Sequence, residues 1–305
     1  MREFDLLRHI YRSNDRLDRA VGIPPGDDMG MIRFGGGEVL AAVDQLVAGR
    51  HVRIETTSVE LVGRKAITRS LSDIAAMAAR PLCTLVAATL PPEFGEDRAR
   101  QLFESMRRTC ERFECPLIGG DLAFHGDPDH PLVCSVTVLA EPGPTPPVLR
   151  SGARPGDTLY VTGQLGGTML DDGSGHHLTF DPRITEALML AELLGDRLHA
   201  MIDLSDGLGR DADHIAEASE VKIVIDAARL PCRGNASWKD ALQNGEDYEL
   251  CFAASGSVPS EVRGVPITPV GEVLSGETGE LPARLCVRDG DTLREAGELG
   301  WQHEA

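Results

Sequence analysis

The sequence predicts a mixed fold of the α/β and α+β classes, built from two units of similar size. Apolar segments of strand length alternate with segments of helical periodicity along both halves of the 305 residues. The segment Glu141–Arg150 contains four prolines in ten residues, which neither a helix nor a central strand accommodates. A chain of this length also exceeds what one core usually holds. We therefore expect domains at residues 1–140 and 151–305, joined by a proline-rich linker at residues 141–150.

Helices in the first half are predicted where apolar residues recur every three to four positions, and strands where short apolar runs end in Pro, Gly or Asp. The predicted helices are Phe4–Tyr11, Ser58–Ala79 and Glu96–Phe113. The predicted strands are Glu38–Val43, Leu82–Leu90, Pro116–Ile118 and Leu132–Leu139.

The second half repeats this alternation, starting with a strand that ends in the glycine-rich sequence GQLGG. Its predicted strands are Thr158–Thr162, Ala200–Ile202, Lys222–Ile225, Glu249–Ala253 and Ile267–Glu272. Helices are expected over Arg183–Leu198 and from the sequence DLSDGLG to about Ser219.

Composition excludes several classes of protein. The net charge is −18 and no segment is rich in lysine or arginine, which argues against a nucleic-acid-binding protein. The seven cysteines have no CxxC spacing, so neither a zinc site nor a disulfide framework is expected. The chain contains no apolar run long enough to span a membrane. We expect a soluble, cytoplasmic protein whose acidity serves solubility or gathers cations.

Several aspartates share one position, where a predicted strand gives way to a glycine-containing turn. They are Asp27, Asp28, Asp44, Asp121, Asp203 and Asp206. Turn chemistry alone can explain each of them, and Asp206 could cap the following helix. Gathered together, however, they would repel one another unless cations lay between them, and carboxylate sites suit Mg²⁺ bound to phosphates.

Acidic residues in two other segments do not follow this pattern. Asp73 lies within an apolar helical stretch, so it needs either a ligand or an ion pair with Lys65 or Arg69. The sequence GEDYEL places Glu246 and Asp247 before a strand, in either a binding segment or a solvated turn. The chain lacks the P-loop and protein-kinase motifs, and the pair His176–His177 has no spaced third metal ligand.

Taken in order, these motifs resemble the thiamine-monophosphate kinase family of the aminoimidazole ribonucleotide synthetase (PurM-like) superfamily. The matching segments are PPGDDMG, VDQLVAGRHV, VGRKAITRSLSDIAAMAARP, IGGD, LRSGARPGDTLYVTG, DPR, MIDLSDGL, GEDYEL and ELGWQHE. The resemblance spans nearly the whole chain.

The resemblance implies a two-domain PurM-like fold, with an N-terminal α+β domain whose sheet forms a barrel across a homodimer and a C-terminal α/β domain. It also implies direct, Mg²⁺-assisted phosphoryl transfer from ATP to thiamine monophosphate, with no covalent or general-base residue. The implied Mg²⁺ ligands are Asp28, Asp44, Asp73, Asp121, Asp203 and Asp206. We therefore expect Asp44, Asp73, Asp121 and Asp206, which come from four separate segments, to converge on one cleft. The implied ATP contacts are Gly120, Asp121, Arg150 and Ser205, and the implied acceptor contacts are His51, Glu246 and Trp301.

The sequence departs from the family at a few positions. Ala42 and Val43 replace hydroxyl residues that the family often uses on Mg²⁺, Ser70 replaces the usual Asn, and Leu122 replaces a Thr. Two alternative functions stay open. One is another enzyme of the superfamily with a different acceptor, although selenophosphate synthetase is disfavoured because the first cysteine is Cys83. The other is a nucleotide-binding protein without catalysis.

Overall fold

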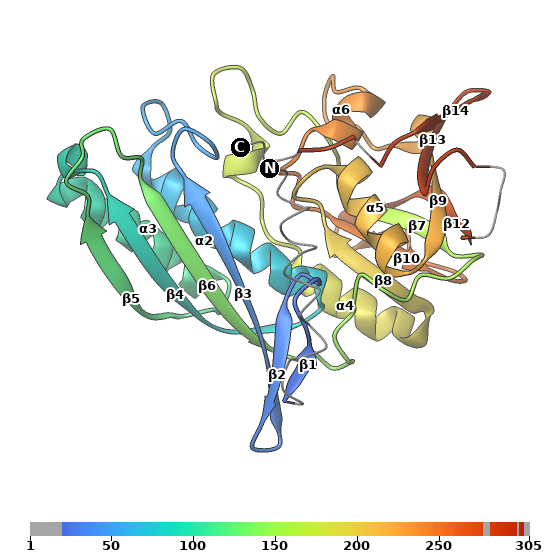
Figure 1. The fold of residues 1–305 in the computed structure, drawn as a ribbon, viewed down its shortest axis with the longest axis horizontal. Helices are drawn as coiled ribbons and strands as arrows, with labels where there is room; N and C mark the ends of the chain where they lie inside the picture. Colours follow the sequence, from blue (N-terminus) through green and yellow to red (C-terminus); the bar gives the residue numbers. More distant parts are fainter. Residues whose placement is uncertain (1–19, 277–280, 298, 302–305) are drawn as a thin grey trace.

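The computed structural model describes residues 20–276, 281–297 and 299–301. The helix predicted at Phe4–Tyr11 lies outside these residues. The described chain forms two mixed sheets with helices packed on them and between them (Figure 1). This confirms the predicted combination of strands and helices in both halves.

The first sheet contains the strands of the N-terminal half, in the order β1-β2-β3-β6-β4-β5. Strands β4 and β5 pair in parallel, whereas the other neighbours pair antiparallel. The strands are β1 Val21–Ile23, β2 Gly30–Phe34, β3 Gly37–Val47, β4 Arg80–Leu90, β5 Leu117–Phe124 and β6 Val133–Glu141.

Two long helices cover one face of this sheet: α2 at Val59–Ala76 and α3 at Glu96–Arg112. Ser58 begins α2 as its N-cap, because its hydroxyl accepts a hydrogen bond from the Leu61 N–H at 3.3 Å. Helix α2 is buried on nearly all sides, since it also packs against α4 and β8 of the C-terminal half. It is therefore the element that joins the two halves.

The second sheet has the order β14-β13-β9-β12-β7-β10-β8, with β11 paired to β12. Its strands are β7 Thr158–Thr162, β8 Leu198–Asp203, β9 Val221–Asp226, β10 Leu250–Ala254, β11 Glu261–Val262, β12 Val265–Ser275, β13 Leu285–Asp289 and β14 Thr292–Glu295. The helices of this half are α4 Ile184–Leu194, α5 Leu208–Ala218 and α6 Trp238–Gln243, with short 3₁₀ turns at His176–Leu178, Gly195–Arg197 and Ala227–Arg229.

The buried core crosses the proline-rich segment. Leu71 of α2 belongs to the same buried cluster as Ile184 of α4 and Phe252 of β10. A second cluster, with Ile223 and Leu285, belongs to the C-terminal sheet alone. The segment between β6 and β7 forms neither helix nor strand, as its prolines predicted. The domain limits at residues 140 and 151 stay a prediction, because the two sheets share part of their core.

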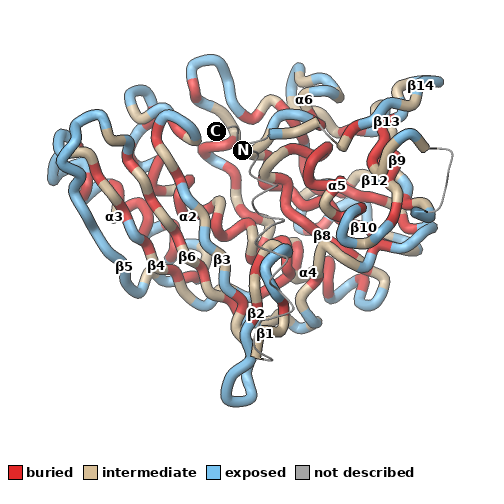
Figure 2. Tube along the Cα trace, in the orientation of Figure 1, coloured by how far each residue is buried: buried red, intermediate tan, exposed pale blue. Residues whose placement is uncertain are grey.

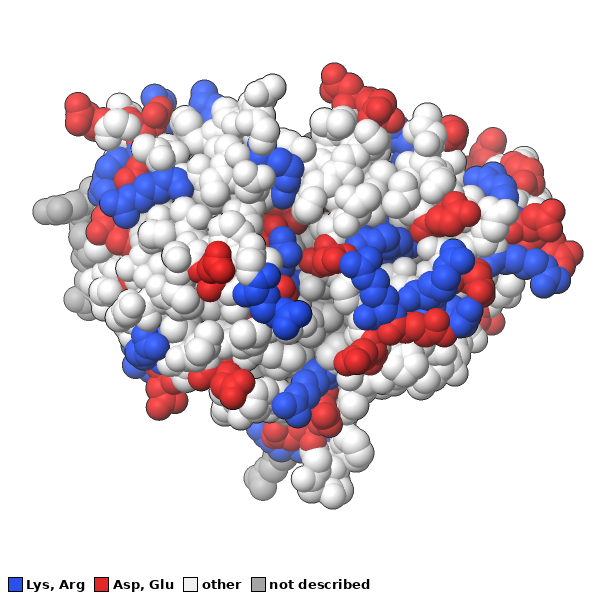
Figure 3. Space-filling view, turned by 180° about the vertical axis from the view of Figure 1, so that it is seen from behind, with Lys and Arg blue, Asp and Glu red and all other residues white. Residues whose placement is uncertain are grey.

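The outer face of the first sheet and its edge strand β5 carry little cover (Figure 2). The side chains of Val43 and Ile118 are each 63% exposed there. On the molecular face shown in Figure 3, acidic and basic side chains are interspersed. On α3, for example, Arg107 forms ion pairs with Glu104 and Glu111.

Two predicted strand ends are wrong. Strand β3 continues to Val47, so Asp44 lies inside the strand and is paired with Val136. Strand β5 continues to Phe124, so Asp121 also lies inside a strand. In both cases pairing with a neighbouring strand, β6 for β3 and β4 for β5, continues past an aspartate, a residue that disfavours strands.

Candidate active site

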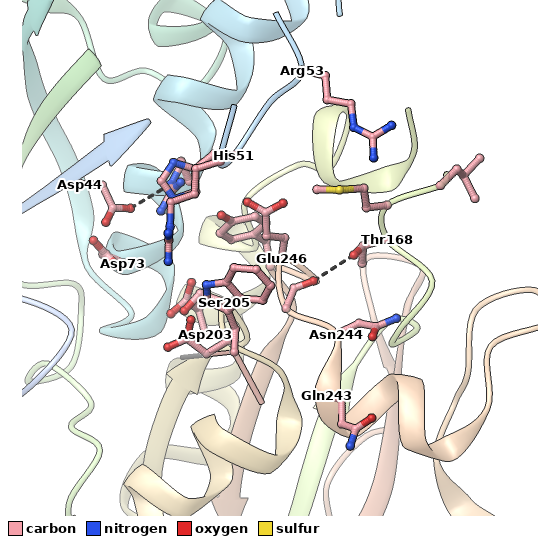
Figure 4. A pocket seen from close by; sticks show the side chains of 18 of the residues that line it. Asp44, His51, Arg53, Asp73, Thr168, Asp203, Ser205, Gln243, Asn244 and Glu246 are labelled. Carbon is pink, nitrogen blue, oxygen red and sulfur yellow. Dashed lines mark hydrogen bonds and ion pairs between the residues drawn. The ribbon is translucent and has the colours of Figure 1, made fainter. Parts of the chain in front are cut away.

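A pocket of about 510 Å³ lies between the two halves and is lined by residues of both. It brings together most of the side chains singled out from the sequence. Those in its lining are Asp44, His51, Asp73, Asp203, Ser205, Asp206, Glu246 and Trp301. Figure 4 shows Asp44, Asp73 and Asp203 at one end of this pocket and Thr168, Gln243 and Asn244 at the other, with Glu246 between them.

Three carboxylates form the densest group at the acidic end. Asp28 follows β1, Asp73 lies in α2, and Asp203 ends β8. One ligand atom from each lies within 4.8 Å of the others. Burial and Asp28 raise the pKa of Asp203 to about 7, and burial together with Asp44 and Asp203 raises the pKa of Asp73 well above its ordinary value. A divalent cation would relieve this repulsion, so the donor set fits a hard ion.

Two side chains hold these carboxylates in place. The Ser72 hydroxyl donates a hydrogen bond to Asp203 at 2.6 Å. Arg150 donates to both oxygens of Asp28, at 2.7 and 3.1 Å, and its backbone N–H donates to Asp27. Arg150 therefore contacts the carboxylate cluster directly, although it does not line the pocket.

Asp44 reaches the pocket from β3, where it faces the same side as buried Leu40 and Leu46. Its ion pair is with Arg69 of α2, at 3.5 Å between Arg69 Nε and Asp44 Oδ2. Arg69 was considered from the sequence as a partner of Asp73, and so was Lys65. The structure pairs Lys65 with Glu246 instead.

Ser205 and Asp206 form the turn between β8 and α5. The N-cap of α5 is Gly207, with φ 102°, so Asp206 does not have the capping position that the sequence left open. The Asp206 backbone N–H donates a hydrogen bond to Asp211 Oδ2 at 3.1 Å, and the Asp206 carbonyl accepts one from the Trp301 N–H at 2.8 Å. The turn thus ties the C-terminal tryptophan to the pocket.

The GEDYEL segment is buried rather than a solvated turn. Glu246 and Tyr248 have φ of 63° and 51°, a strained region for such residues. Glu246 meets Lys65 at 2.8 Å, and although burial pushes its pKa upward, the positive charges of Lys65 and Arg69 oppose this and lower the pKa. Its carboxylate is therefore charged in the pocket.

The two other acids of the segment have structural partners. Arg233 donates to Asp247 at 3.0 Å. Arg183 donates to Glu249 through Nε at 2.7 Å. Only Glu246 among the three acids lines the pocket.

Gly120 and Asp121 do not join this pocket in a single chain. Gly120 lies in register with Asp44 across β6 and β4. Asp44 and Val86 both pair with Val136 of β6, and Val86 also pairs with Gly120. Three strand spacings separate them by about 14 Å. Asp121 is paired with exposed Ala87, so it points to the opposite face of the sheet from Asp44. The expected convergence of Asp121 with the other aspartates is wrong for one chain.

Sequence reasoning missed several residues of the pocket. They are Arg50, Arg53, Arg69, Thr168, Met169, Leu170, Asp171, Gln243, Asn244, Gly245 and Tyr248. The glycine-rich GQLGG signalled a loop after β7, but not that the loop would reach the pocket. The seven cysteines are all unpaired, as expected. None of the helices in the described part of the chain is both long and apolar enough to cross a membrane.

Comparison with known proteins identifies relatives along most of the chain. Residues 26–141 match the family described as AIR synthase related protein, N-terminal domain. The thiamine-monophosphate kinase of Rhodopirellula baltica is 35% identical over 85% of this chain and 85% of its own length. That of Mycobacterium tuberculosis is 33% identical over 98% of this chain and 91% of its own.

Solved structures share the fold. The thiamine-monophosphate kinase of Stenotrophomonas maltophilia superposes with a TM-score of 0.70, with 28% identity over 93% of this chain and 96% of its own. A protein named AaThiL, complexed with AMPPCP and TMP, superposes with a TM-score of 0.76, with 24% identity over 99% of this chain and 97% of that chain. The PurM-like arrangement of two mixed sheets is therefore shown.

Proposed function

This chain belongs to the thiamine-monophosphate kinase family, and we propose that it transfers the γ-phosphoryl group of ATP to thiamine monophosphate, forming thiamine diphosphate. The observation that carries this proposal is the pocket itself. Carboxylates from Asp44, Asp73 and Asp203, which are far apart in sequence, face one cavity together with a charged Glu246. Phosphoryl transfer needs this combination, because it depends on positioning and on neutralising phosphate charge.

Mg²⁺ is the proposed metal. Asp28, Asp73 and Asp203 would hold an ion between them, and Asp44 and Asp206 would serve further ions on the phosphates. When bound, Mg²⁺ neutralises the charge that develops on the transferring phosphoryl group. Asp121 lies on the exposed strand β5, outside the pocket of a single chain. It would join this metal set only in the homodimer proposed below, which covers β5.

The chain's own residues would divide the pocket between the two substrates. Ser205, beside the cluster, and Arg150, which holds Asp28, are proposed ATP contacts. Gly120 and Asp121 on β5 are further proposed ATP contacts, although they lie outside this pocket in a single chain. His51, Glu246 and Trp301 are proposed acceptor contacts. The Trp301 ring is half-exposed and lies 5.7 Å from the Arg50 guanidinium, so it already faces one cation and could face the thiazolium.

Direct transfer requires no protein nucleophile. An oxygen of the acceptor phosphate forms the new bond to the γ-phosphorus, while the bond from γ-phosphorus to the bridging oxygen of ADP breaks. The acceptor phosphate is already ionised near neutral pH, so no general base is assigned. The chain's residues align the two phosphates and exclude water.

We further propose a homodimer. The outer face of the first sheet and edge strand β5 expose apolar side chains, which an isolated sheet does not leave uncovered. These are Ile32, Phe34, Val43, Leu82, Ile118, Leu122 and Phe124. A second copy with two-fold symmetry would cover them and close the sheets into a barrel. Light scattering should then report about twice the chain mass of 32.8 kDa, whereas a monomer at micromolar concentration would contradict the dimer.

A cytoplasmic location belongs to the same proposal. All seven cysteines are unpaired, and five of them are buried. Unpaired thiols are typical of reducing compartments.

The proposed activity is tested by incubating the protein with ATP, Mg²⁺ and thiamine monophosphate, and measuring thiamine diphosphate by mass spectrometry. An Asp203→Asn variant purified in parallel controls for a contaminating kinase. Product formation by the wild type alone supports the proposal. ATP consumption only with another phosphorylated acceptor would favour a different enzyme of the superfamily, and nucleotide binding without turnover would favour a binding protein.

A further inference from the structure

The ammonium group of Lys65 is fully buried and has three acceptors. Lys65 Nζ lies 2.6 Å from the His51 carbonyl oxygen, 2.7 Å from His177 Nδ1 and 2.8 Å from Glu246 Oε2. An ammonium group has three hydrogens to donate, so every donor is used. Lys65 comes from α2, whereas His51 follows β3, His177 lies in a 3₁₀ turn and Glu246 precedes β10. One cation thus joins four segments.

The contacts of His177 fix its tautomer. His177 Nε2 lies 3.1 Å from the Gly173 carbonyl, which can only accept, so Nε2 carries the hydrogen. Nδ1 then accepts from Lys65, and the ring is neutral. The distance of 3.3 Å between Nδ1 and Glu246 Oε2 is therefore a contact of two acceptors on one ammonium, with no hydrogen between them.

His177 extends this link to the loop at residues 168–173. Its ring donates to the Gly173 carbonyl, and its backbone N–H donates to the Thr168 carbonyl at 3.2 Å. The two ends of the loop are therefore held by one residue. Between them, Met169, Leu170 and Asp171 line the pocket.

Glu246 is held by one oxygen only. Both Lys65 and His177 meet it at Oε2, and among the described residues no hydrogen bond engages Oε1. Glu246 lines the pocket, where its side chain is 18% exposed. The ion pair thus fixes the direction of the carboxylate while one oxygen stays available to a bound molecule.

We propose that Lys65 is the positioning residue of the acceptor subsite, holding His51, Glu246 and the loop at residues 168–173 in the arrangement that binds thiamine monophosphate. This inference rests on the proposed function. Lys65 does not line the pocket, so it acts through the three groups that it joins. The nucleotide end of the pocket has its own supports, Ser72 and Arg150, which Lys65 does not touch.

Arg64 provides a matched control. It is the neighbour of Lys65 in α2 and also crosses to the C-terminal half, donating to Phe180 O and, at 2.6 Å, to Asp181. It does not line the pocket and touches neither His177 nor Glu246 in the described contacts. If Lys65 only tied the two halves together, loss of either side chain should have similar consequences.

The test compares Lys65→Met and Arg64→Met with the wild type by steady-state kinetics, by calorimetric titration with thiamine monophosphate alone, and by melting curves. Lys65→Met should raise the KM for thiamine monophosphate and weaken its binding about 10- to 100-fold, the usual cost of losing a group that orients a binding residue. The KM for ATP should change little. Arg64→Met should leave both KM values near those of the wild type.

His177→Leu tests the same inference if Lys65→Met does not fold. It keeps the Lys65–Glu246 ion pair but releases the loop, so it should also raise the KM for thiamine monophosphate selectively. Equal increases in both KM values, or an unchanged acceptor KM in a folded Lys65→Met or His177→Leu protein, would overturn the inference. A wild type that makes no thiamine diphosphate would instead overturn the proposed function.

Discussion

At the scale of one side chain, Asp73 is expected to serve metal binding while it destabilises the metal-free protein. It is buried in α2, and the nearby carboxylates of Asp44 and Asp203 oppose its ionisation. We predict that Asp73→Asn, measured without metal at about pH 8, stabilises the protein by about 1–2 kcal/mol, because an uncharged Asn removes the cost of burying an acid beside Asp44 and Asp203. The same variant should gain less in melting temperature from Mg²⁺ with a non-hydrolysable ATP analogue than the wild type does.

Thermal melts of the two proteins, each with and without that ligand pair, check this prediction. A metal-free Asp73→Asn protein that melts below the wild type would mean that Asp73 has a structural partner. In that case repulsion within the carboxylate cluster would not be what destabilises the metal-free protein.

The buried ion pair between Lys65 and Glu246 predicts that acceptor binding depends on pH. Burial lowers the pKa of Lys65 to about 8, while Glu246 opposes this shift. The ammonium form therefore predominates below that pH, and the ion pair with Glu246 is lost above it. The KM for thiamine monophosphate should rise between about pH 7 and about pH 9 in the wild type, and should not do so in Lys65→Met.

Stability should move differently over that range. Because the folded pKa of Lys65 is below its unfolded value of 10.5, the folded state binds fewer protons between these two pKa values. The contribution of this group to the free energy of unfolding then increases with pH in that window. Melting curves recorded beside the kinetics separate lost binding from lost structure, and a wild-type acceptor KM that is flat with pH would argue against the ion pair.

Trp301 tests the acceptor end at the residue scale. Trp301→Ala removes an aromatic face for a cation, worth roughly 0.5–2 kcal/mol, so the KM for thiamine monophosphate should rise about 2- to 30-fold with the KM for ATP little changed. If the ring only packs the C-terminus, both substrates should suffer alike and the melting temperature should fall. Kinetics and a melting curve on this one variant distinguish the two roles.

At the scale of elements, Gly120 shows how tightly β5 approaches β4. A Cβ built on Gly120 would lie 1.9 Å from the Val86 carbonyl oxygen, which is backbone and cannot move aside cheaply. We predict that Gly120→Ala forces the parallel pair apart and lowers the free energy of unfolding by about 1–3 kcal/mol. The matched control is Gly119→Ala, where the nearest atom to the added Cβ is a Leu85 methyl carbon at 3.8 Å.

Denaturant unfolding of both variants checks this. Equal stability of the Gly119→Ala and Gly120→Ala proteins would contradict the close approach. A loss of ATP affinity in Gly120→Ala without loss of stability would instead favour the nucleotide contact proposed for this glycine.

Helix positions followed from the sequence more closely than strand ends did. Helix α3 begins at the predicted Glu96, and α2 begins just after Ser58, because periodic apolar residues mark both helices and the Ser58 hydroxyl caps α2. Strand β3 was predicted to stop before Asp44, since aspartate and glycine disfavour strands. It continues because β6 pairs with it along its length, which is a tertiary contact that local propensity does not contain.

At the scale of the whole molecule, the pocket depends on contacts between distant segments. Periodicity and spacing identified Asp28, Asp73 and Asp203 as unusual acids, but not that they would meet. Their convergence follows from α2 packing against both β3 and β8, and it was implied only by the family resemblance. Lys65 was missed as part of the site because a lysine in a helix normally reaches solvent, whereas this one lies beneath the pocket wall.

The sheets also explain why Asp121 stands apart. Successive side chains of a strand point to opposite faces of the sheet. Asp44 and Asp121 therefore lie on opposite faces, and two strands, β6 and β4, lie between their own strands. Sequence motifs give neither the strand order nor the face. Only the sheet register shows that β5 presents Asp121 to the uncovered side of the molecule.

The central claim is direct transfer of the γ-phosphoryl group from ATP to thiamine monophosphate in this pocket. The most direct measurement uses ATP with heavy oxygen in its γ-phosphoryl group, Mg²⁺ and unlabelled thiamine monophosphate, and weighs both the product and the intact protein. The account predicts heavy label in the terminal phosphoryl group of thiamine diphosphate and a protein of unchanged mass throughout turnover. Unlabelled product, or a labelled phosphoryl group on the protein during turnover, would contradict it.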